Sequence, residues 1–385
     1  MYKKEALNLH KRLRGKIEVK SKISVNSKKE LSLIYTPGVA EVCKEIYIKK
    51  NIYDYTIKSN SVGIITDGSA VLGLGNIGPE AALPVMEGKA VLFKEFANID
   101  AFPICLKTQD TNEIIQIVKN ISTVFGGINL EDISAPRCFE IENKLQDIGI
   151  PVMHDDQHGT SIVVLAALIN ACKAAKKDFE DIKVVVNGAG AAGNAVSRLL
   201  VCADYYDKTC RSVKELMVCD SKGIIYKGRK NLEEHKIKLS NLTNKKRIKG
   251  TLKEAIVGAD VFIGVSVANV LNESMIRSMN KDPIIFAMAN PIPEIMPNKA
   301  KRAGAKIVAT GRSDFPNQVN NSLAFPGVFR GALDGKAKKI TAKMKINAAY
   351  ALAKTIEKPD VNRILPLVFD KNIVKNIAKA VIKNI

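Results

Sequence analysis

Short apolar runs alternate with longer segments of helical periodicity along most of this chain. The strand-length runs VVVN, ELMVCD, VFIGVS, PIIFAMAN and KIVATG follow one another with helical patterns between them. Such alternation is typical of parallel strands in one sheet with helices on both faces. We therefore predict an α/β protein in which residues 156–385 form a doubly wound parallel sheet followed by C-terminal helices.

Residues 1–155 are predicted to form a smaller N-terminal α/β domain. The run VGIIT ends at Thr66 and is followed by a turn, a glycine-rich segment, a helical pattern and a second strand-like run. Helical spacing recurs over residues 111–124, and apolar positions within residues 6–13 also fall near helical spacing. We expect that N-terminal helix to pack on a domain or on a second subunit.

Two segments match the pattern G-x-G-x-x-G, but only one has the context of a dinucleotide-binding turn. A turn separates GLGNIG, at 73–78, from the strand before it, so we interpret it as a coincidental match. GAGAAG directly follows VVVN, a helical pattern begins at once, and the next strand ends in Asp220, 32 residues beyond Gly188. A polar insert at 204–212 explains why this offset exceeds the usual one of about 20. This order predicts a Rossmann-like NAD(P)-binding domain.

Such a turn binds its ligand mainly through the backbone. Its first two glycines allow close approach to a pyrophosphate, and the helix N-terminus offers unpaired N–H groups. The carboxylate of Asp220 is expected to accept hydrogen bonds from the adenosine ribose. Ligands of these sheets lie at the carboxyl ends of strands, where Ser266 and Asn290 fall. The cofactor-binding residues predicted here are Gly188, Ala189, Gly190, Ala191, Ala192, Gly193, Asp220, Ser266 and Asn290.

Two pairs of adjacent acids are candidates for chemistry. Asp155 and Asp156 lie between a short apolar run and a long apolar helical pattern that begins near Gly159, and Glu131 and Asp132 lie upstream. Adjacent carboxylates repel each other and are costly to bury, so a positive group is expected beside them. A hard cation such as Mg or Mn and a lysine ammonium both fit. Solvated acids, with Asp156 capping the helix, are the simpler alternative.

Composition limits the remaining classes of protein. The chain has 385 residues, 46% of them hydrophobic, which suffices for two or three domains, and no apolar run is expected to span a bilayer. The net charge of +20 is compatible with nucleic-acid binding, but the lysines are dispersed and only 5% of the residues are aromatic. Seven scattered cysteines favour free thiols and a cytoplasmic location, with Cys172 and Cys202 as core residues.

Nine motifs stand in order from about Leu31 to Gly331: YTPGVA, TDGSAVLGLGNIGP, MEGKAVLFK, LEDI, HDDQHGT, VVVNGAGAAG, VCDSKGIIYKGR, FAMANP and NNSLAFPG. With these motifs the chain resembles malic enzymes of the short bacterial type. The resemblance implies oxidative decarboxylation of L-malate to pyruvate and carbon dioxide, with reduction of NAD or NADP and dependence on Mg or Mn. It also implies a homodimer, and an active site shared between subunits is compatible with it.

The resemblance further implies a role for each matching residue. Tyr35 and Lys89 match the family's catalytic tyrosine and lysine, with Lys89 assigned by analogy as the base and Tyr35 as the acid that protonates C3. Asp155 matches the catalytic acid that hydrogen-bonds near the lysine. The residues that match metal ligands are Glu131, Asp132 and Asp156. Those that match positions lining the substrate and the nicotinamide are Asn290, Asn320 and Asn321, and Asn320 is also counted as cofactor-binding.

Some alternatives remain open. Larger family members carry a substrate-clamping arginine where this chain has Ala70, so another cation, or the metal and the asparagines, must hold the carboxylate. Asp220 favours NAD because a carboxylate repels a 2′-phosphate, but Lys222 and Arg229 keep NADP open. Malolactic chemistry, which yields lactate and no net reduced cofactor, is the closest alternative function. A basic nucleic-acid-binding protein on a Rossmann scaffold is a more remote one.

Overall fold

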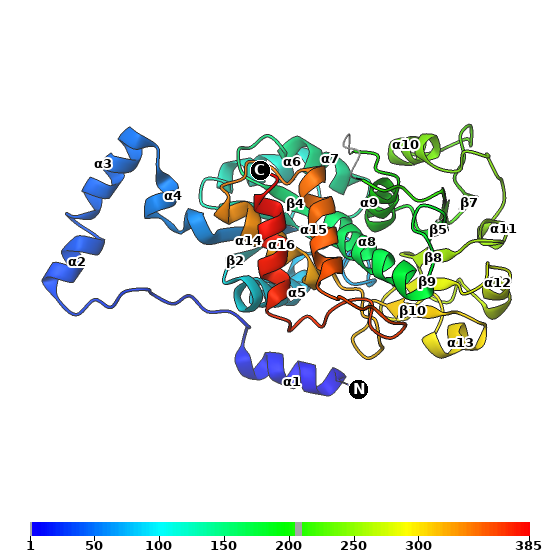
Figure 1. The fold of residues 1–385 in the computed structure, drawn as a ribbon. Helices are drawn as coiled ribbons and strands as arrows, with labels where there is room; N and C mark the ends of the chain where they lie inside the picture. The colour runs from blue at the N-terminus through cyan, green and yellow to red at the C-terminus, as the bar shows by residue number, and fades with distance from the viewer. Residues whose placement is uncertain (1, 205–209) are drawn as a thin grey trace.

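A computed structural model describes residues 2–204 and 210–385, with two sheets in one body and an N-terminal arm beside it (Figure 1). Residues 205–209, part of the polar insert predicted at 204–212, lie outside the described residues. The first sheet has the strand order β2-β1-β3-β4, and its strands are all parallel. Its strands are β1 (Ser61–Thr66), β2 (Asp100–Cys105), β3 (Gly127–Leu130) and β4 (Val152–His154).

The second sheet has the order β10-β9-β8-β5-β6-β7, parallel except for the short antiparallel β7. Its strands are β5 (Lys183–Asn187), β6 (Glu215–Asp220), β7 (Gly223–Ile224), β8 (Val261–Gly264), β9 (Ile284–Ala287) and β10 (Ile307–Thr310). The chain order reverses between β5 and β8, so the crevice at their carboxyl ends is the expected ligand site of a doubly wound sheet. Both sheets agree with the α/β class predicted from the sequence.

Helices occur in both parts of the chain. In the first part they are α1 (Lys3–Leu13), α2 (Lys28–Ile34), α3 (Val39–Lys49), α4 (Ile52–Tyr55), the 3-10 turn η1 (Ile57–Asn60), α5 (Pro79–Ala97), α6 (Thr111–Ile121) and α7 (Arg137–Leu145). In the second part they are α8 (Asp155–Ala175), α9 (Ala191–Leu200), α10 (Glu234–Leu242), α11 (Leu252–Ala255), α12 (Glu273–Arg277), α13 (Pro297–Arg302), η2 (Asn321–Leu323), α14 (Phe325–Asp334), α15 (Ala342–Lys354) and α16 (Asn372–Ile382).

Helix α8 lies between the two sheets and packs against α9 and α15. By length and composition it is the one helix of the described chain that could cross a membrane, and 67% of its most apolar window is buried inside the protein. The expectation that no apolar run reaches that length was wrong. The helix is apolar on nearly every side because neighbouring elements cover it, which is typical of a core helix in a large protein.

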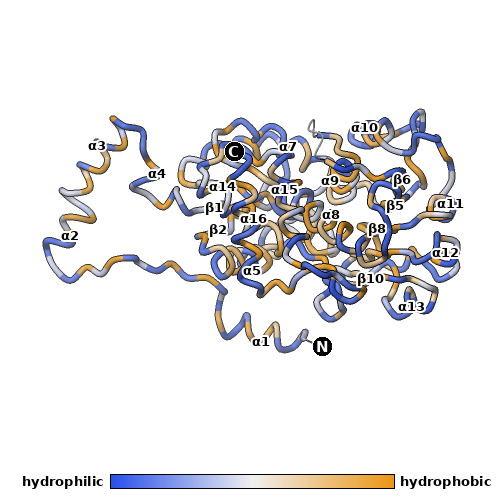
Figure 2. Tube along the Cα trace, viewed as in Figure 1, coloured by the Kyte–Doolittle hydropathy of each residue, from blue (hydrophilic) through white to orange (hydrophobic). Residues whose placement is uncertain are grey.

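The N-terminal arm, which includes α1 to α4, projects from the body (Figure 1). Hydrophobic residues recur along it (Figure 2), and Leu7, Leu33 and Ile48 are 72%, 62% and 72% exposed. Helices α2, α3 and α4 bury none of their residues within the described chain. Apolar surface of this extent on a helical arm is characteristic of an interaction site.

The C-terminal helices return to the first part of the chain. Helix α14 packs on α5 and β3, and the ring of Phe93 lies 4.7 Å from that of Phe325 and 5.5 Å from that of Phe329, measured between centroids. The division predicted at residues 155 and 156 falls at the start of α8, between the sheets. This division stays a prediction. Helix α14, which comes after it in the chain, packs into the core of the part that precedes it.

Two expectations about the cysteines were wrong. Cys202 and Cys210 form a disulfide with a Cα–Cα distance of 6.1 Å, although no disulfide was expected, and Cys202 is only half-buried. Cys172, by contrast, is a buried free thiol, as predicted. The pair escaped sequence analysis because a spacing of eight residues matches no recognised motif.

Candidate active site

The predicted lysine and two of the predicted acids meet at the centre of the molecule. Lys89, on α5, is only 7% exposed, and its Nζ lies 2.5 Å from Glu131 Oε2 and in contact with Asp155 Oδ2. The ammonium also lies 4.5 Å from the centroid of the Phe325 ring. Asn321 donates a 2.6 Å hydrogen bond to the same oxygen of Asp155. Asn321, which belongs to the second part of the chain, therefore contacts the same carboxylate oxygen as Lys89.

The topology of the first sheet explains this convergence. Strands β3 and β4 are parallel neighbours, with Leu130 paired to His154, so the residues that follow each strand leave the sheet at the same edge. Glu131 and Asp132 follow β3, while Asp155 and Asp156 begin α8. The backbone N–H of Asp132 donates a 2.8 Å hydrogen bond to Asp156 Oδ2. The two acidic pairs of the sequence thus form one cluster.

Burial dominates the ionisation of the cluster. It raises the pKa of Asp155, Glu131 and Asp132, that of Asp132 to about 8, and the charge of Asp156 adds to each rise. Burial opposes the charge on Lys89, but Asp155 and Glu131 outweigh it and raise the pKa of the lysine. Four carboxyl groups share one ammonium, so the cluster can accept a further positive charge.

Three of the acids fit a divalent metal ion. Glu131, Asp132 and Asp156 each offer a carboxylate oxygen, and the three oxygens lie within 4.8 Å of one another. Oδ2 of Asp132 is buried and has no hydrogen-bond partner among the described residues. Mg and Mn prefer such all-oxygen ligand sets, and a bound cation would satisfy that buried oxygen.

A cavity of about 850 Å³ opens beside the cluster and is lined by both parts of the chain. Of the predicted site residues, those lining it are Lys89, Glu131, Asp132, Asp156, Gly190, Ala191, Ala192, Ser266, Asn290, Asn320 and Asn321. The Ser266 hydroxyl is held by a 2.7 Å hydrogen bond from Asn187 at the end of β5. The predicted metal, substrate and nicotinamide positions therefore face one volume.

The glycine turn joins β5 to α9. Gly188 has φ +123°, and a Cβ on Gly193 would lie 1.8 Å from the Gly188 carbonyl oxygen, so only glycine fits at both positions. A Cβ on Gly190 would meet open space, so its backbone is free to approach a ligand. Gly193 thus serves helix packing, as the last glycine of the motif does. In GLGNIG, Val71 and Gly75 form a bridge within a loop, away from any such strand-to-helix turn.

Gly188, Ala189 and Asp220 line a second cavity of about 670 Å³, which continues from Gly190 and Ser266 towards the end of β6. Both oxygens of Asp220 accept hydrogen bonds from Arg229 Nη2, at 2.7 and 2.9 Å, and Lys236 Nζ lies 3.5 Å away. Burial opposes the charge on Asp220, but its bonds from Arg229 and the Lys222 backbone lower its pKa.

Tyr35 is not brought to this site within one chain. It follows α2 on the N-terminal arm, is 68% exposed, and does not line the cavity that holds Lys89. Its motif predicted a role but carried no information about its position. Of all the predicted site residues, it is the one that the fold leaves outside.

Ala70 lines the cavity, as the resemblance implies. Sequence analysis missed two other lining residues, His10 and Lys16, from the segment around α1. Lys16 Nζ donates a 2.5 Å hydrogen bond to the carbonyl of Pro84 on α5. Burial lowers the pKa of this lysine. The basic run KRLRGK contains Lys16, but a basic run by itself does not indicate a position beside a cavity.

The fold and the site together define a class: the dinucleotide-binding α/β proteins, with a buried cluster of acids and a lysine facing the dinucleotide crevice. Two family models match the chain, the malic enzyme N-terminal domain over residues 14–146 and the malic enzyme NAD-binding domain over residues 157–385. The chain belongs to the malic enzyme family.

Individual relatives agree with this assignment. The chain is 56% identical, over 99% of its length and 92% of the relative's, to the bifunctional malic/malolactic enzyme of Bacillus subtilis. It is 52% identical to the NAD-dependent malic enzyme of Geobacillus stearothermophilus, over 96% of this chain and 76% of the relative. It also superposes with a TM-score of 0.92 on the NAD-dependent malic enzyme of Thermotoga maritima, at 48% identity and with 98% of each chain covered.

Proposed function

We propose that the protein oxidises and decarboxylates L-malate to pyruvate and carbon dioxide and reduces NAD or NADP. The observation that carries this proposal is the single cavity lined by Lys89, by the acids at positions 131, 132 and 156, and by the glycine turn. Hydride transfer requires the substrate C2 and the nicotinamide to meet in one volume. This cavity offers groups suited to both.

The chain's own groups perform the proton steps in this proposal. Lys89 removes the proton of the C2 hydroxyl as the hydride leaves for the nicotinamide, and Asp155 positions its ammonium. Asn290, Asn320 and Asn321 orient the substrate and the nicotinamide. When bound by Glu131, Asp132 and Asp156, Mg or Mn supplies Lewis-acid polarisation of the C2 oxygen. Asp155 and Glu131 raise the pKa of Lys89, and a cation held by the neighbouring acids would oppose that rise.

We further propose that the active site is shared in a homodimer. Tyr35 protonates C3 at the cavity of a partner subunit, since its own chain keeps it on an exposed arm. The apolar side chains of that arm, such as Leu33 and Ile48, support burial against a second copy. Two further proposals concern location and organisation: the enzyme works in the cytoplasm, and the catalytic part ends at residue 155.

NAD is the cofactor we propose as preferred. Asp220 ends β6, where a carboxylate accepts ribose hydroxyls and repels a 2′-phosphate. Arg229 and Lys236 already pair with this carboxylate, so they are not free to bind a phosphate while it stays in place.

A second candidate is malolactic conversion on the same site. The bifunctional malic/malolactic relative from Bacillus subtilis, at 56% identity, favours it. The two functions differ in products, because malolactic conversion gives lactate and leaves no net reduced cofactor.

One assay tests the proposal. Purified enzyme is given L-malate and Mn with NAD and, separately, with NADP, and pyruvate, lactate and reduced nicotinamide are all measured. We expect pyruvate and reduced nicotinamide in equal amounts, with faster turnover on NAD. Lactate without net reduced cofactor would select the malolactic function, and no consumption of malate would refute both.

A further inference from the structure

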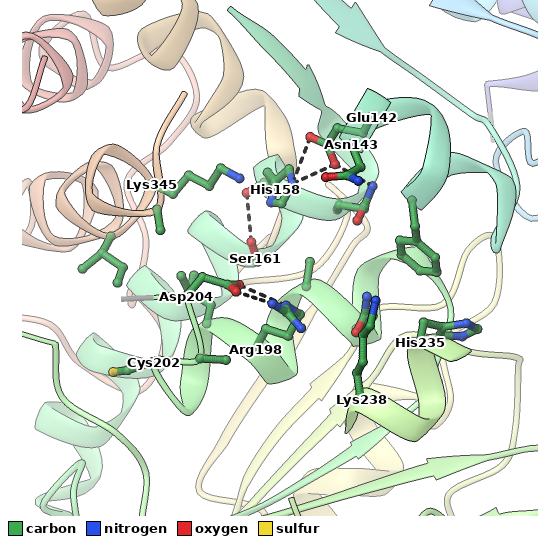
Figure 3. Close-up of a pocket in the computed structure, with 18 of the residues that line it drawn as sticks. Glu142, Asn143, His158, Ser161, Arg198, Cys202, Asp204, His235, Lys238 and Lys345 are labelled. Carbon is green, nitrogen blue, oxygen red and sulfur yellow. Dashed lines mark hydrogen bonds and ion pairs between the residues drawn. The ribbon is translucent and has the colours of Figure 1, made fainter. Parts of the chain in front are cut away.

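A third cavity, of about 480 Å³, lies between α7, α8, α9, α10 and α15 (Figure 3). Among the described residues, it shares none of its lining with the cavity that holds Lys89. Its volume falls within the range of small-molecule sites, about 300–1,000 Å³. The proposed reaction uses none of the side chains that line it.

Among residues 2–204 and 210–385, the charged groups around this cavity are paired except for one. Glu142 accepts hydrogen bonds from the His154 backbone, Gln157 and His158, at 3.0, 2.9 and 3.0 Å. Asp204 forms two hydrogen bonds with Arg198, one of them at 3.0 Å. Both lining acids are therefore already engaged, and neither is free to neutralise another cation.

Lys345 is the charged group for which the described part of the chain offers no partner. It lies on α15, is half-buried, and points its ammonium into the cavity towards His158 (Figure 3). Within residues 2–204 and 210–385 it forms no ion pair or hydrogen bond through its side chain. Burial lowers the pKa of this ammonium even though Glu142 and Asp204 act in the opposite direction. An ammonium in this state gains free energy from any anion that reaches it.

Lys238 is the remaining lining lysine, and it is already paired with Glu234 on the surface of α10, at 2.7 Å. The excess positive charge of the cavity is thus concentrated at Lys345. We propose that this cavity binds a small organic anion, with a carboxylate or phosphate group paired to Lys345. The cavity shares no described lining residue with the one that holds Lys89, whereas His235 lines both it and the cavity beside Asp220. Arg198 also lines it, paired with Asp204.

The test compares two lysines on one helix. Lys345→Gln removes the proposed ligand, while Lys343→Gln removes an exposed lysine two residues away on α15. Binding is measured by calorimetry on the full chain without added metal, with citrate as the carboxylate probe and glucose 6-phosphate as the phosphate probe. We expect saturable binding of at least one probe to the wild type and to Lys343→Gln. In Lys345→Gln the affinity should fall about tenfold or more, because a charge-assisted hydrogen bond is lost.

The choice between the probes identifies the anionic group. Binding of citrate alone indicates a carboxylate ligand, and binding of glucose 6-phosphate alone indicates a phosphate ligand. If neither probe binds, or if Lys345→Gln binds as tightly as the wild type, the proposal is wrong. The second result would place the bound anion outside this cavity.

A melting experiment gives an independent readout. Lys345→Met keeps the length of the apolar stem but removes the unpaired charge, so we expect its melting temperature without anion to match or exceed that of the wild type. The probe that binds should raise the melting temperature of the wild type and leave Lys345→Met unchanged. A large loss of stability in Lys345→Met, or an equal rise with the probe, would show that Lys345 is a structural residue and would overturn the proposal.

Discussion

The backbone N–H of Asp132 donates a 2.8 Å hydrogen bond to the carboxylate of Asp156, a residue 24 positions further along the chain. This contact fixes two acids from different strand ends in one place and leaves Oδ2 of Asp132 buried without a partner in the described structure. A buried oxygen of this kind is destabilising on its own. A bound cation would pair with this oxygen and remove that cost. The unpartnered oxygen therefore favours metal binding.

An active site shared between two subunits leads to a quantitative prediction. Tyr35→Phe and Lys89→Met should each have very low activity alone, because each removes one of the two proposed proton-transfer groups. Co-expressed in equal amounts, they should recover about a quarter of wild-type activity, since half of the dimers are mixed and each mixed dimer has one intact site.

The control for this experiment is the mixture of each variant with itself, treated in the same way. Lack of any recovery in a preparation shown to contain mixed dimers would place Tyr35 and Lys89 of one active site on the same chain. It would thereby refute the shared site without touching the proposed reaction.

Cofactor choice should depend on Asp220. Asp220→Asn keeps the shape of the side chain but removes the charge that repels a 2′-phosphate, and it leaves Arg229 and Lys236 without their anionic partner. We expect the ratio of kcat/KM for NAD to that for NADP to fall about tenfold or more, since this is an electrostatic effect of roughly 1–2 kcal/mol.

Glu233→Gln is a matched control, because Glu233 lines the same cavity and pairs with Lys236 at 2.8 Å. Its ratio should stay close to that of the wild type. Equal shifts in both variants would mean that the general charge of the cavity, and not Asp220, sets the preference.

Stability should depend on pH through Glu142. Burial disfavours its charge, but His158 and its hydrogen bonds hold the pKa at about 2, below the value of about 4.3 for an unfolded chain. Because the folded pKa is lowered, this stabilisation is complete above about pH 4.3 and is lost as the pH falls towards 2. Glu142→Gln should therefore destabilise the protein at neutral pH and progressively less in acid.

Melting temperatures of the wild type and Glu142→Gln across this pH range measure the effect. Glu140→Gln, an exposed neighbour on α7, should melt like the wild type throughout. A constant gap between Glu142→Gln and the wild type down to acid pH would show that shape, and not charge, explains the loss.

Local structure was predictable from the sequence, whereas contacts between residues far apart in the chain were not. The strand before Gly188 and the helix after it appear within a short stretch, so the dinucleotide turn was found directly. The meeting of Glu131 with Asp156 depends on β3 and β4 being neighbours in a sheet, which no local pattern states. Only the order of motifs typical of the family linked the two acidic pairs.

Other features depend on the three-dimensional structure and have no local signal in the sequence. The apolar pattern of α8 did not reveal that the helix would be enclosed between two sheets. The YTPG motif gave Tyr35 a role, but the exposed position of this side chain depends on how the whole arm leaves the body. The pairing of Arg229 with Asp220 likewise depends on the path of the chain after β6.

The most direct test of the proposed metal site is a titration of the purified enzyme with Mn, monitored by calorimetry, in the wild type and in Asp156→Asn. We expect one Mn site per chain in the wild type and an affinity that falls at least about tenfold in the variant, because a carboxylate ligand becomes a neutral amide. Turnover of malate at limiting Mn should fall with it. Unchanged Mn affinity in Asp156→Asn would contradict a metal held by the acids at positions 131, 132 and 156.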